Sequence, residues 1–438
     1  MTTDFHPTVY DLEGYLRTSP DPRALPGTDH PAAVTPTIDS YYQGLVDALG
    51  RTSPALPHPY LVPGAEYHSL WTWDTYFLGM ALPASLTAHE VGSLRNLLER
   101  LADDGRPPSR IDPDGSADFR HVGQPIHAAW TVSLCTRLAR PDLAAELWPD
   151  LLRLRDWWDR HTLGRRGLYR WVRDSGTGID NDPALYGRGG DTVALVDVNC
   201  FHYRELVAMG LLAELVDAPG ADTWHERADA LRASINTFMW DEAQGTYFHL
   251  DLTPHRWKTF QEITWEVPLL TQTWANLFPL WTGVADQRRA DRLVTGHVLD
   301  ERRFRSRYGL RSTPADQRFY NNQVMANPSN WQGPVWGLNT ALTAYGLARY
   351  GYRTEATALA DDLRATFTRD LARTGAIHEY YDAETGRPLA HPHFVSWNLL
   401  ATRLSSDLAT GHDPTRLSRP SGDTGSGHAP PAGGSPRA

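Results

Sequence analysis

The chain has 438 residues, of which 41% are hydrophobic and 21% are charged, so it can bury a large core and is not a disordered protein. Its formal net charge is −10, and Lys258 is the one lysine among 42 basic residues. This balance argues against nucleic acid as the main partner, because phosphate binding needs a basic surface.

The first residues, MTTDFHPTVYDLEGYL, carry no charged segment followed by an apolar run, so we expect no secretory signal. No uninterrupted apolar run of about eighteen residues occurs, which predicts no membrane span. Cys135 and Cys200 lie in apolar helical patterns without the spacing of a disulfide framework or a metal site, and we expect both in the core. The expected compartment is cytoplasmic, and the sequence leaves the oligomeric state open.

Composition divides the chain into three parts. Residues 1–35 are rich in Pro, Thr and Asp and are expected to form an N-terminal extension. Residues 406–438 are rich in Gly, Pro and Ser and have too little apolar surface to order themselves, which predicts a disordered tail. Residues 36–405 between them are expected to form one folded domain.

The folded part is predicted to be all-α. In residues 142–161, an apolar stripe recurs at the spacing of one helix face, formed by Leu143, Leu147, Leu151, Leu154 and Trp158. Similar stripes start at Trp224, Val335 and Leu359. Further helices are expected at 37–50, 74–83, 87–103, 124–139, 194–216, 264–281, 284–298 and 393–404. No alternating run is long enough for a main sheet, and residues 245–252 are expected to form only a short hairpin arm.

About a dozen amphipathic helices in one domain favour paired helices arranged as a barrel or a solenoid, and the lack of a fixed-period repeat argues against the solenoid. Long polar loops come at regular intervals, at residues 105–122, 173–193, 302–334 and 376–393. Loops of this length inside a compact domain are usually functional. In a helical barrel they can gather at one end and converge on a pocket.

Four segments place acids or amides beside aromatic side chains. They are residues 63–77 with Asp74, residues 168–188 with Asp180, residues 327–339 with Trp331, and residues 375–389 with Glu379. Aromatic rings stack on sugar faces, while carboxylates and amides hydrogen-bond sugar hydroxyls. Hydrolysis of a glycosidic bond uses two carboxyls, one protonated and one ionised. Asp180 and Glu379 can form such a pair only if the fold brings their loops together.

Residues 63–77, PGAEYHSLWTWDTYF, resemble the signature of trehalases. The positions that match in register are Pro63, Gly64, Trp73, Asp74 and Tyr76. Glu66 and Ser69 stand where trehalases have Arg and Glu, so the match is incomplete and a trehalose-like glycoside is one of several candidate substrates, beside glucosylglycerate and small oligosaccharides.

The other segments resemble glycoside hydrolase family sixty-three, which includes mannosylglycerate and glucosylglycerate hydrolases. Residues 178–183, GIDNDP, are similar to the Gly-Met-Asp-Asn-Ser-Pro segment of that family, with Asp182 in place of Ser. Residues 330–336, NWQGPVW, resemble its Tyr-Trp-Arg-Gly-Pro-Val-Trp segment. Residues 378–389, HEYYDAETGRPL, and 123–128, GQPIHA, resemble two more of its motifs. Together the motifs cover residues 60 to about 400.

This resemblance implies an (α/α)6 barrel and hydrolysis with inversion. Carried over position by position, Asp180 is the general acid, Glu379 is the general base that activates water, and Asp74 with Trp73 holds the sugar. The other implied substrate-binding residues are Tyr76, Gln124, Asn181, Trp331, Gln332, Gly333, Trp336, Tyr380 and Trp397. Protonation of Asp180 near neutral pH requires a raised pKa, through burial or a nearby carboxylate such as Asp74.

Other residues compete for these roles. Asp174 and Asp182 are the nearest alternatives to Asp180, and Glu384 is the alternative to Glu379. The histidines lack acidic or Cys partners at ligand spacing, so we expect surface or core positions and neither a metal nor a cofactor for His121, His127, His378, His391 and His393.

The arginines of residues 302–318 are expected to form a solvated face. In an alternative interpretation, Arg305, Arg307 or Arg311 binds an anionic aglycone such as glycerate through bidentate contacts.

The expected function is inverting hydrolysis of a small α-glucoside or α-mannoside, with a small carbohydrate as the partner. One alternative is a sugar isomerase or epimerase on the same barrel, which would use histidines rather than the Asp180 and Glu379 pair. A second alternative is a sugar-binding protein that kept the pocket without hydrolysis.

Overall fold

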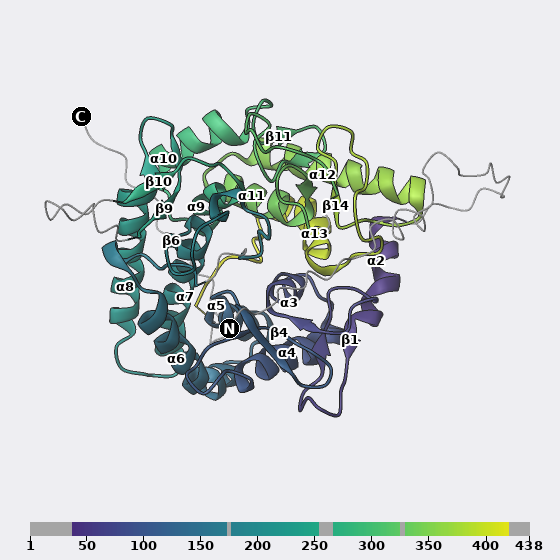
Figure 1. Ribbon diagram of the computed structural model, residues 1–438. Coiled ribbons are helices and arrows are strands. Elements are labelled where there is room, and N and C mark those ends of the chain that lie inside the picture. Colours follow the sequence, from purple (N-terminus) through teal and green to yellow (C-terminus); the bar gives the residue numbers. More distant parts are fainter. Residues whose placement is uncertain (1–36, 173–176, 254–265, 325–328, 420–438) are drawn as a thin grey trace, which may run out of the picture.

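Helices dominate the computed structural model, which describes residues 37–172, 177–253, 266–324 and 329–419. The expected N-terminal extension, residues 1–35, lies outside these ranges. Within them, twelve α-helices form an inner and an outer ring (Figure 1). The inner helices are α3 (Thr72–Gly79), α5 (His127–Leu138), α7 (Val196–Leu215), α9 (Phe278–Thr282), α11 (Gly337–Arg349) and α13 (Ser396–Thr410). The outer helices are α2 (Ile38–Val46), α4 (Thr87–Glu99), α6 (Asp142–Thr162), α8 (Ala221–Ser234), α10 (Gln287–Leu293) and α12 (Arg353–Thr374).

Burial explains which helices lie inside. All of α9 and the stretch of α11 from Gly337 to Leu347 are buried, as expected of helices surrounded by protein. Outer helix α6 buries one stripe, which contains the five residues expected there. Contacts join α3 to α13, α13 to α11, α11 to α9, α9 to α7 and α7 to α5, while α8 and α12 pack outside α7 and α11. This is an (α/α)6 barrel, and the all-α fold class is confirmed.

Short antiparallel strands lead into the inner helices. One three-stranded sheet contains β3 (Leu70–Trp71), β4 (Pro108–Ile111) and β5 (Ala117–Val122), and the other contains β10 (Val267–Leu269), β9 (His249–Asp251) and β6 (Val193–Ala194). The two-stranded sheets pair β1 (Gly50–Arg51) with β2 (Tyr60–Leu61), β7 (Trp240–Asp241) with β8 (Thr246–Tyr247), β11 (Arg305–Ser306) with β12 (Gly309–Leu310), and β13 (Val335–Trp336) with β14 (Tyr380–Tyr381). Strands β3 and β13 run directly into α3 and α11. As expected, no main sheet exists among the described residues.

The helix expected over residues 264–281 is wrong. Residues 267–269 form β10, a 3-10 turn follows, and α9 begins only at Phe278. Pro268 lies in the strand opposite Leu250, and Pro279 lies in the first turn of α9, where its missing N–H breaks no helix hydrogen bond. The apolar spacing in this segment therefore came from two different elements.

Two expected connections also differ. Residues 105–122, expected to be a polar loop, contain the β4–β5 hairpin. Residues 245–252, expected to form one hairpin arm, divide between two sheets, because β8 pairs with β7 whereas β9 lies between β10 and β6.

The tail boundary expected at residue 406 is wrong, because it lies inside α13. Beyond this helix, Thr415 is buried, where its carbonyl accepts from Arg204 and its hydroxyl accepts from the indole of Trp281. These contacts tie the segment after α13 to inner helices α7 and α9. Residues 420–438 lie outside the described ranges.

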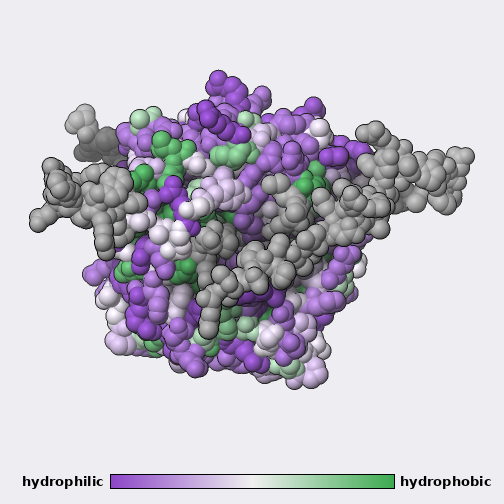
Figure 2. Space-filling view, viewed as in Figure 1, coloured by the Kyte–Doolittle hydropathy of each residue, from purple (hydrophilic) through white to green (hydrophobic). Residues whose placement is uncertain are grey.

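The exterior and the core agree with the composition. Cys135 and Cys200 are buried and free, as expected. The face viewed in Figure 2 is mainly hydrophilic, with separate apolar areas. None of the described helices is long and apolar enough to cross a membrane.

Candidate active site

A pocket with a cavity volume of about 460 Å³ opens at the end of the barrel where the inner helices begin. Trp73 and Asp74 lie in the first turn of α3, Gln124 precedes α5, and Trp397 is the second residue of α13. Asp180, Trp331 and Glu379 reach the same pocket from three long connections. The barrel thus brings together seven of the residues that the motifs imply, from segments up to about 320 residues apart in the sequence.

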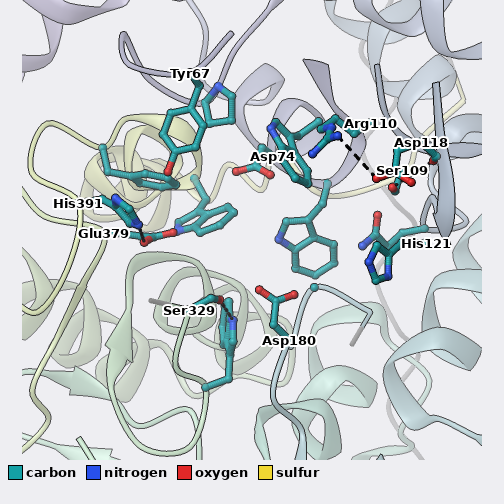
Figure 3. Close-up of a pocket in the computed structure, with 18 of the residues that line it drawn as sticks. Tyr67, Asp74, Ser109, Arg110, Asp118, His121, Asp180, Ser329, Glu379 and His391 are labelled. Carbon is teal, nitrogen blue, oxygen red and sulfur yellow. Dashed lines mark hydrogen bonds and ion pairs between the residues drawn. The ribbon is translucent and has the colours of Figure 1, made fainter. Parts of the chain in front are cut away.

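Three carboxyl groups of the recognised motifs, Asp74, Asp180 and Glu379, face this pocket, and Asp118 is a fourth carboxyl in its lining (Figure 3). Glu379 is buried, Asp74 is half-buried, and Asp180 is open to the cavity although the barrel encloses it. Burial raises the pKa of all three carboxyls, and repulsion from its neighbours raises the pKa of Glu379 further. Near neutral pH the group therefore holds protons that exposed carboxyls would have lost.

Close packing holds the loop that carries Asp180. Gly178 has a φ of +114°, and a Cβ there would lie 2.7 Å from the ring of Trp73, so only glycine fits. The Gln124 amide donates to the carbonyl of Thr177 at 2.9 Å, and the Thr177 hydroxyl donates to buried Asp197. These contacts fix the backbone that precedes Asp180.

The side chain of Asn181 fixes the other side of the loop. Its Oδ1 accepts from the backbone N–H of Trp331 at 2.7 Å, and its Nδ2 donates to Asn330 Oδ1 at 3.0 Å. Asp182 is buried, accepts from the N–H of Ala184 at 2.9 Å and lies 3.2 Å from His249 Nε2. Asp182 therefore stabilises the turn after Asp180 and lies outside the pocket lining, and the other alternative, Asp174, is outside the described residues.

Glu379 directly precedes β14, whose Tyr380 pairs with Trp336 of β13. Its N–H donates to the carbonyl of Ala390 at 3.1 Å, and its Oε2 lies 3.8 Å from His391 Nε2. The alternative base, Glu384, has a half-exposed side chain paired with Arg311 at 2.9 Å, away from the pocket lining.

Three aromatic residues implied by the motifs are buried behind the residues that line the pocket. Trp336 stacks on Trp331 with ring centroids 3.9 Å apart, and Tyr380 stacks on Trp336 at 4.4 Å. Tyr76 is buried, and its hydroxyl accepts from Arg204 at 3.2 Å. Tyr76, Trp336 and Tyr380 are absent from the described lining of this pocket, because helix and strand geometry turns these rings into the core.

Three polar residues of the motifs also hold loops together. The Gln332 amide donates to the carbonyl of Asn181 at 2.9 Å and to the Tyr186 hydroxyl at 2.8 Å. The N–H of Gly333 donates to the hydroxyl of Ser312 at 3.2 Å. Asn181, Gln332 and Gly333 thus join the loops around Asp180 and Trp331 and are absent from the described lining of the pocket.

One wall of the pocket comes from a segment that no recognised motif covers. The β4–β5 hairpin contributes Ser109, Arg110, Asp118, Arg120 and His121. Alternation of apolar and polar residues over 117–120 is a signal for a strand here, although it is short and lies within a segment whose polar composition predicts a loop.

Other lining residues lie beside the recognised motifs. Tyr67 follows Glu66 within the trehalase-like segment, and Ser329 precedes Trp331. His121 is exposed and His391 is partly exposed, and both line the pocket, whereas His127 is buried and His378 pairs with Asp370 at 2.9 Å. The described residues contain no group of three or more His, Cys, Asp or Glu side chains that could hold a metal ion.

The alternative role for the arginines of residues 302–318 is also corrected. Arg311 is buried and donates to backbone carbonyls of Glu301 and Arg303, and Arg305 pairs with Asp362. Arg307 lies over the ring of Tyr308. None of the three belongs to the described lining of the pocket, so none is placed to bind an aglycone there.

Replacement of Asp74 by Asn is expected to stabilise the protein at pH 8 by about 1–3 kcal/mol and to have little effect near pH 4. The pKa of Asp74 rises from 3.8 to about 7, chiefly through burial, with a smaller decrease from the hydrogen bond donated by Ser396. Between these pH values the folded state binds more protons than the unfolded state, so stability falls as pH rises. Urea denaturation of both proteins at pH 4, 6 and 8 measures the effect, and a difference that does not change with pH would contradict it.

Comparison with known proteins places these features in a family. The family model of the mannosylglycerate hydrolase MGH1-like glycoside hydrolase domain matches residues 67–397. A mannosylglycerate hydrolase from Rubrobacter radiotolerans is 28% identical over 177 residues, which is 40% of this chain and 36% of the relative. A periplasmic trehalase from Escherichia coli O1:K1 is 22% identical over 387 residues, which is 75% of this chain and 64% of the relative. The matches thus span less than two thirds of either relative.

Among solved structures, the family sixty-three mannosylglycerate hydrolase from Thermus thermophilus in complex with glucose superposes with a TM-score of 0.66 at 22% identity. The superposition covers 85% of this chain and 100% of that one, so the two share a fold. The family model spans most of the barrel and the segments that carry Asp74, Asp180 and Glu379. The chain therefore belongs to the mannosylglycerate hydrolase MGH1-like family of glycoside hydrolases.

Proposed function

We propose that this protein is an inverting α-glycosidase that hydrolyses a small α-glucoside or α-mannoside. The observation that carries the proposal is the position of Asp180 and Glu379, which face one cavity from separate loops with the aromatic rings of Trp73, Trp331 and Trp397 around them. Hydrolysis with inversion requires two carboxyls that act from opposite sides of the sugar ring. A cavity of about 460 Å³ is of the size that holds small ligands.

In the proposed reaction, the protonated carboxyl of Asp180 donates its proton to the glycosidic oxygen as the bond to the anomeric carbon breaks. Ionised Glu379 takes a proton from a water molecule, whose oxygen attacks the anomeric carbon from the opposite face. The aglycone leaves with its oxygen protonated, and the sugar gains the hydroxyl. Asp180 is then ionised and Glu379 protonated, and exchange with water in the open pocket resets both groups.

The environment of Asp180 supports its assignment as the acid, and the environment of Glu379 predicts how activity depends on pH. Burial raises the pKa of Asp180, which favours the proton that a general acid needs near neutral pH. Glu379 must lose its proton, and its raised pKa predicts that this loss limits activity on the acid side of the pH profile. Because the three carboxyls titrate together, the two limbs of the profile report on the group rather than on single residues.

Sugar binding would use the ring faces of Trp73, Trp331 and Trp397, which line the pocket. The indole N–H groups of Trp73 and Trp397 are buried, so these two side chains would contribute their rings rather than hydrogen-bond donors. Asp74 lies beside them with Oδ1 accepting from Ser396 at 3.1 Å, which leaves its other oxygen for a sugar hydroxyl. A carboxylate and two indoles of this kind suit a hexose.

Product stereochemistry tests the mechanism directly. We expect the β-anomer of the sugar to appear first when an α-glycoside is cleaved, followed by slow mutarotation to the equilibrium mixture. Proton NMR during turnover of trehalose, kojibiose, maltose, glucosylglycerate and mannosylglycerate identifies both the substrate and the anomer. Trehalose releases one α-glucose and one β-glucose under inversion, so the test uses the other substrates. From these, a glycosyl unit released first as the α-anomer would overturn the inverting assignment.

A sugar isomerase or epimerase remains the second candidate because His121 and His391 both line the pocket. Incubation of the protein with free glucose or free mannose tests it, since interconversion of the two sugars without any glycoside would favour that activity. The expected cytoplasmic compartment stays a prediction, because a periplasmic trehalase is among the relatives.

A further inference from the structure

The β4–β5 hairpin forms a charged wall of the pocket that the proposed mechanism does not use. Arg110, Asp118 and Arg120 line the cavity from this hairpin, and Ser109 and His121 flank them. In Figure 3, Asp180 lies between this wall and the opposite side of the pocket, which carries Glu379 and His391. Because the general acid protonates the leaving oxygen, the wall faces the aglycone of a bound glycoside.

Both arginines of the wall are already neutralised by aspartates. Arg120 donates to Asp118 through Nε at 3.1 Å and through Nη2 at 2.8 Å, which is a bidentate pair. Arg110 lies 3.0 Å from Asp112 and 3.7 Å from Asp118, and its guanidinium stacks over Trp71 at 5.0 Å. Two guanidinium groups and two carboxylates thus sum to no net charge.

Asp118 is the centre of this arrangement. Its side chain is only 8% exposed, it also accepts from the N–H of Arg120 at 2.9 Å, and it contacts both arginines. The hydrogen bonds from Arg120 lower the pKa of Asp118 to about 2, so the carboxylate is ionised near neutral pH. A carboxylate on the aglycone would have to compete with Asp118 for the same guanidinium groups.

The rest of the pocket offers few positive groups that could bind a carboxylate on the aglycone. Asp74, Asp180 and Glu379 are acids. The Coulomb interaction of Asp180 with His121 offsets a small part of the rise in the pKa of Asp180 that burial causes. Arg110 and Arg120 are the arginines of the described lining. An anionic aglycone would meet a pocket that is neutral at the wall and acidic beyond it, which opposes binding by Coulomb repulsion.

We propose that Asp118 is a specificity-determining residue that makes this pocket select an uncharged aglycone, a polyol or a sugar, over one that carries a carboxylate. The proposal rests on the proposed function, since it assumes that a glycoside occupies the pocket. Asp118 acts by occupying the guanidinium groups of Arg110 and Arg120.

A matched pair of substrates isolates the effect of charge. Glucosylglycerol and glucosylglycerate differ only in a hydroxymethyl group replaced by a carboxylate. We expect the parent protein to cleave the neutral glycoside with at least about tenfold higher kcat/KM. In Asp118→Asn the ratio of the two kcat/KM values should fall about tenfold or more, because charge-assisted hydrogen bonds from the released arginines become available to the carboxylate.

Two further variants complete the design. Arg120→Gln removes a guanidinium and leaves the charge of Asp118 less neutralised, so the preference for the neutral glycoside should increase. The Arg120 side chain is 79% exposed, so the substitution should not affect folding. Asp114→Asn removes the same charge as Asp118→Asn from the turn of this hairpin, where Asp114 accepts from Ser116 at 2.6 Å outside the pocket lining. The ratio should be unchanged in this control.

Binding measurements separate this proposal from the hydrolase itself. Calorimetric titration of Glu379→Gln with each glycoside gives the selectivity without turnover. If the parent cleaves neither glycoside but the variants shift binding as expected, the specificity assignment stands and the proposed reaction fails. A parent protein that prefers glucosylglycerate, or an Asp118→Asn variant with an unchanged ratio, would overturn the role of Asp118.

Discussion

Asp180→Asn is expected to lower kcat on an α-glycoside with a sugar or polyol leaving group by about 10²–10⁴-fold, the contribution typical of a general acid. The amide keeps the size of the side chain and cannot donate the proton that the leaving oxygen needs. The same variant should retain much more of its activity on α-glucosyl fluoride, because fluoride leaves without protonation. Initial rates on both substrates give the comparison.

Glu379→Gln provides the matched control for that comparison. Loss of the base removes activation of water whatever the leaving group, so activity should fall by about 10²–10⁴-fold on the glycoside and on the fluoride alike. Equal losses on the two substrates in both variants would contradict the separate assignment of acid and base. Sugar binding with no hydrolysis in the parent protein would instead favour a binding protein that kept the pocket.

Trp336→Ala is expected to lower the free energy of unfolding by about 3–5 kcal/mol, the usual cost of truncating a buried tryptophan. The ring of Trp336 is fully buried between Trp331 and Tyr380, and its indole N–H donates to the carbonyl of Asn330 at 2.9 Å. Denaturation in urea measures the change.

Leu152→Ala supplies a surface control for Trp336→Ala, because Leu152 is 38% exposed on outer helix α6 and its truncation should change stability by less than about 0.5–1 kcal/mol. A Trp336→Ala protein with normal stability and selectively weakened sugar binding would show that the ring contacts the substrate after all. The two outcomes distinguish a supporting residue from a binding residue.

The positions of Asp74, Asp180 and Glu379 could be predicted because each lies in a short motif whose residues act locally. Asp180 is a clear case, since Gly178 and Asn181 beside it provide the tight contact with Trp73 and the link to Trp331. Trp331 and Trp336 show the limit of the same motif. Both rings belong to it and are stacked together, but Trp331 reaches the cavity and Trp336 is covered by Tyr380.

The sequence by itself determined the helical class and, through motifs that resemble a known family, three of the four acids that line the pocket, because the spacing of apolar residues along a helix face and a short motif are local properties. Only the tertiary structure decided which side chains surround those acids. The ion pair of Arg110 with Asp118 depends on the register of the β4–β5 hairpin, and the approach of His391 to Glu379 depends on the fold of the connection between α12 and α13. Such contacts come from pairing across the chain, which no periodicity within one segment encodes.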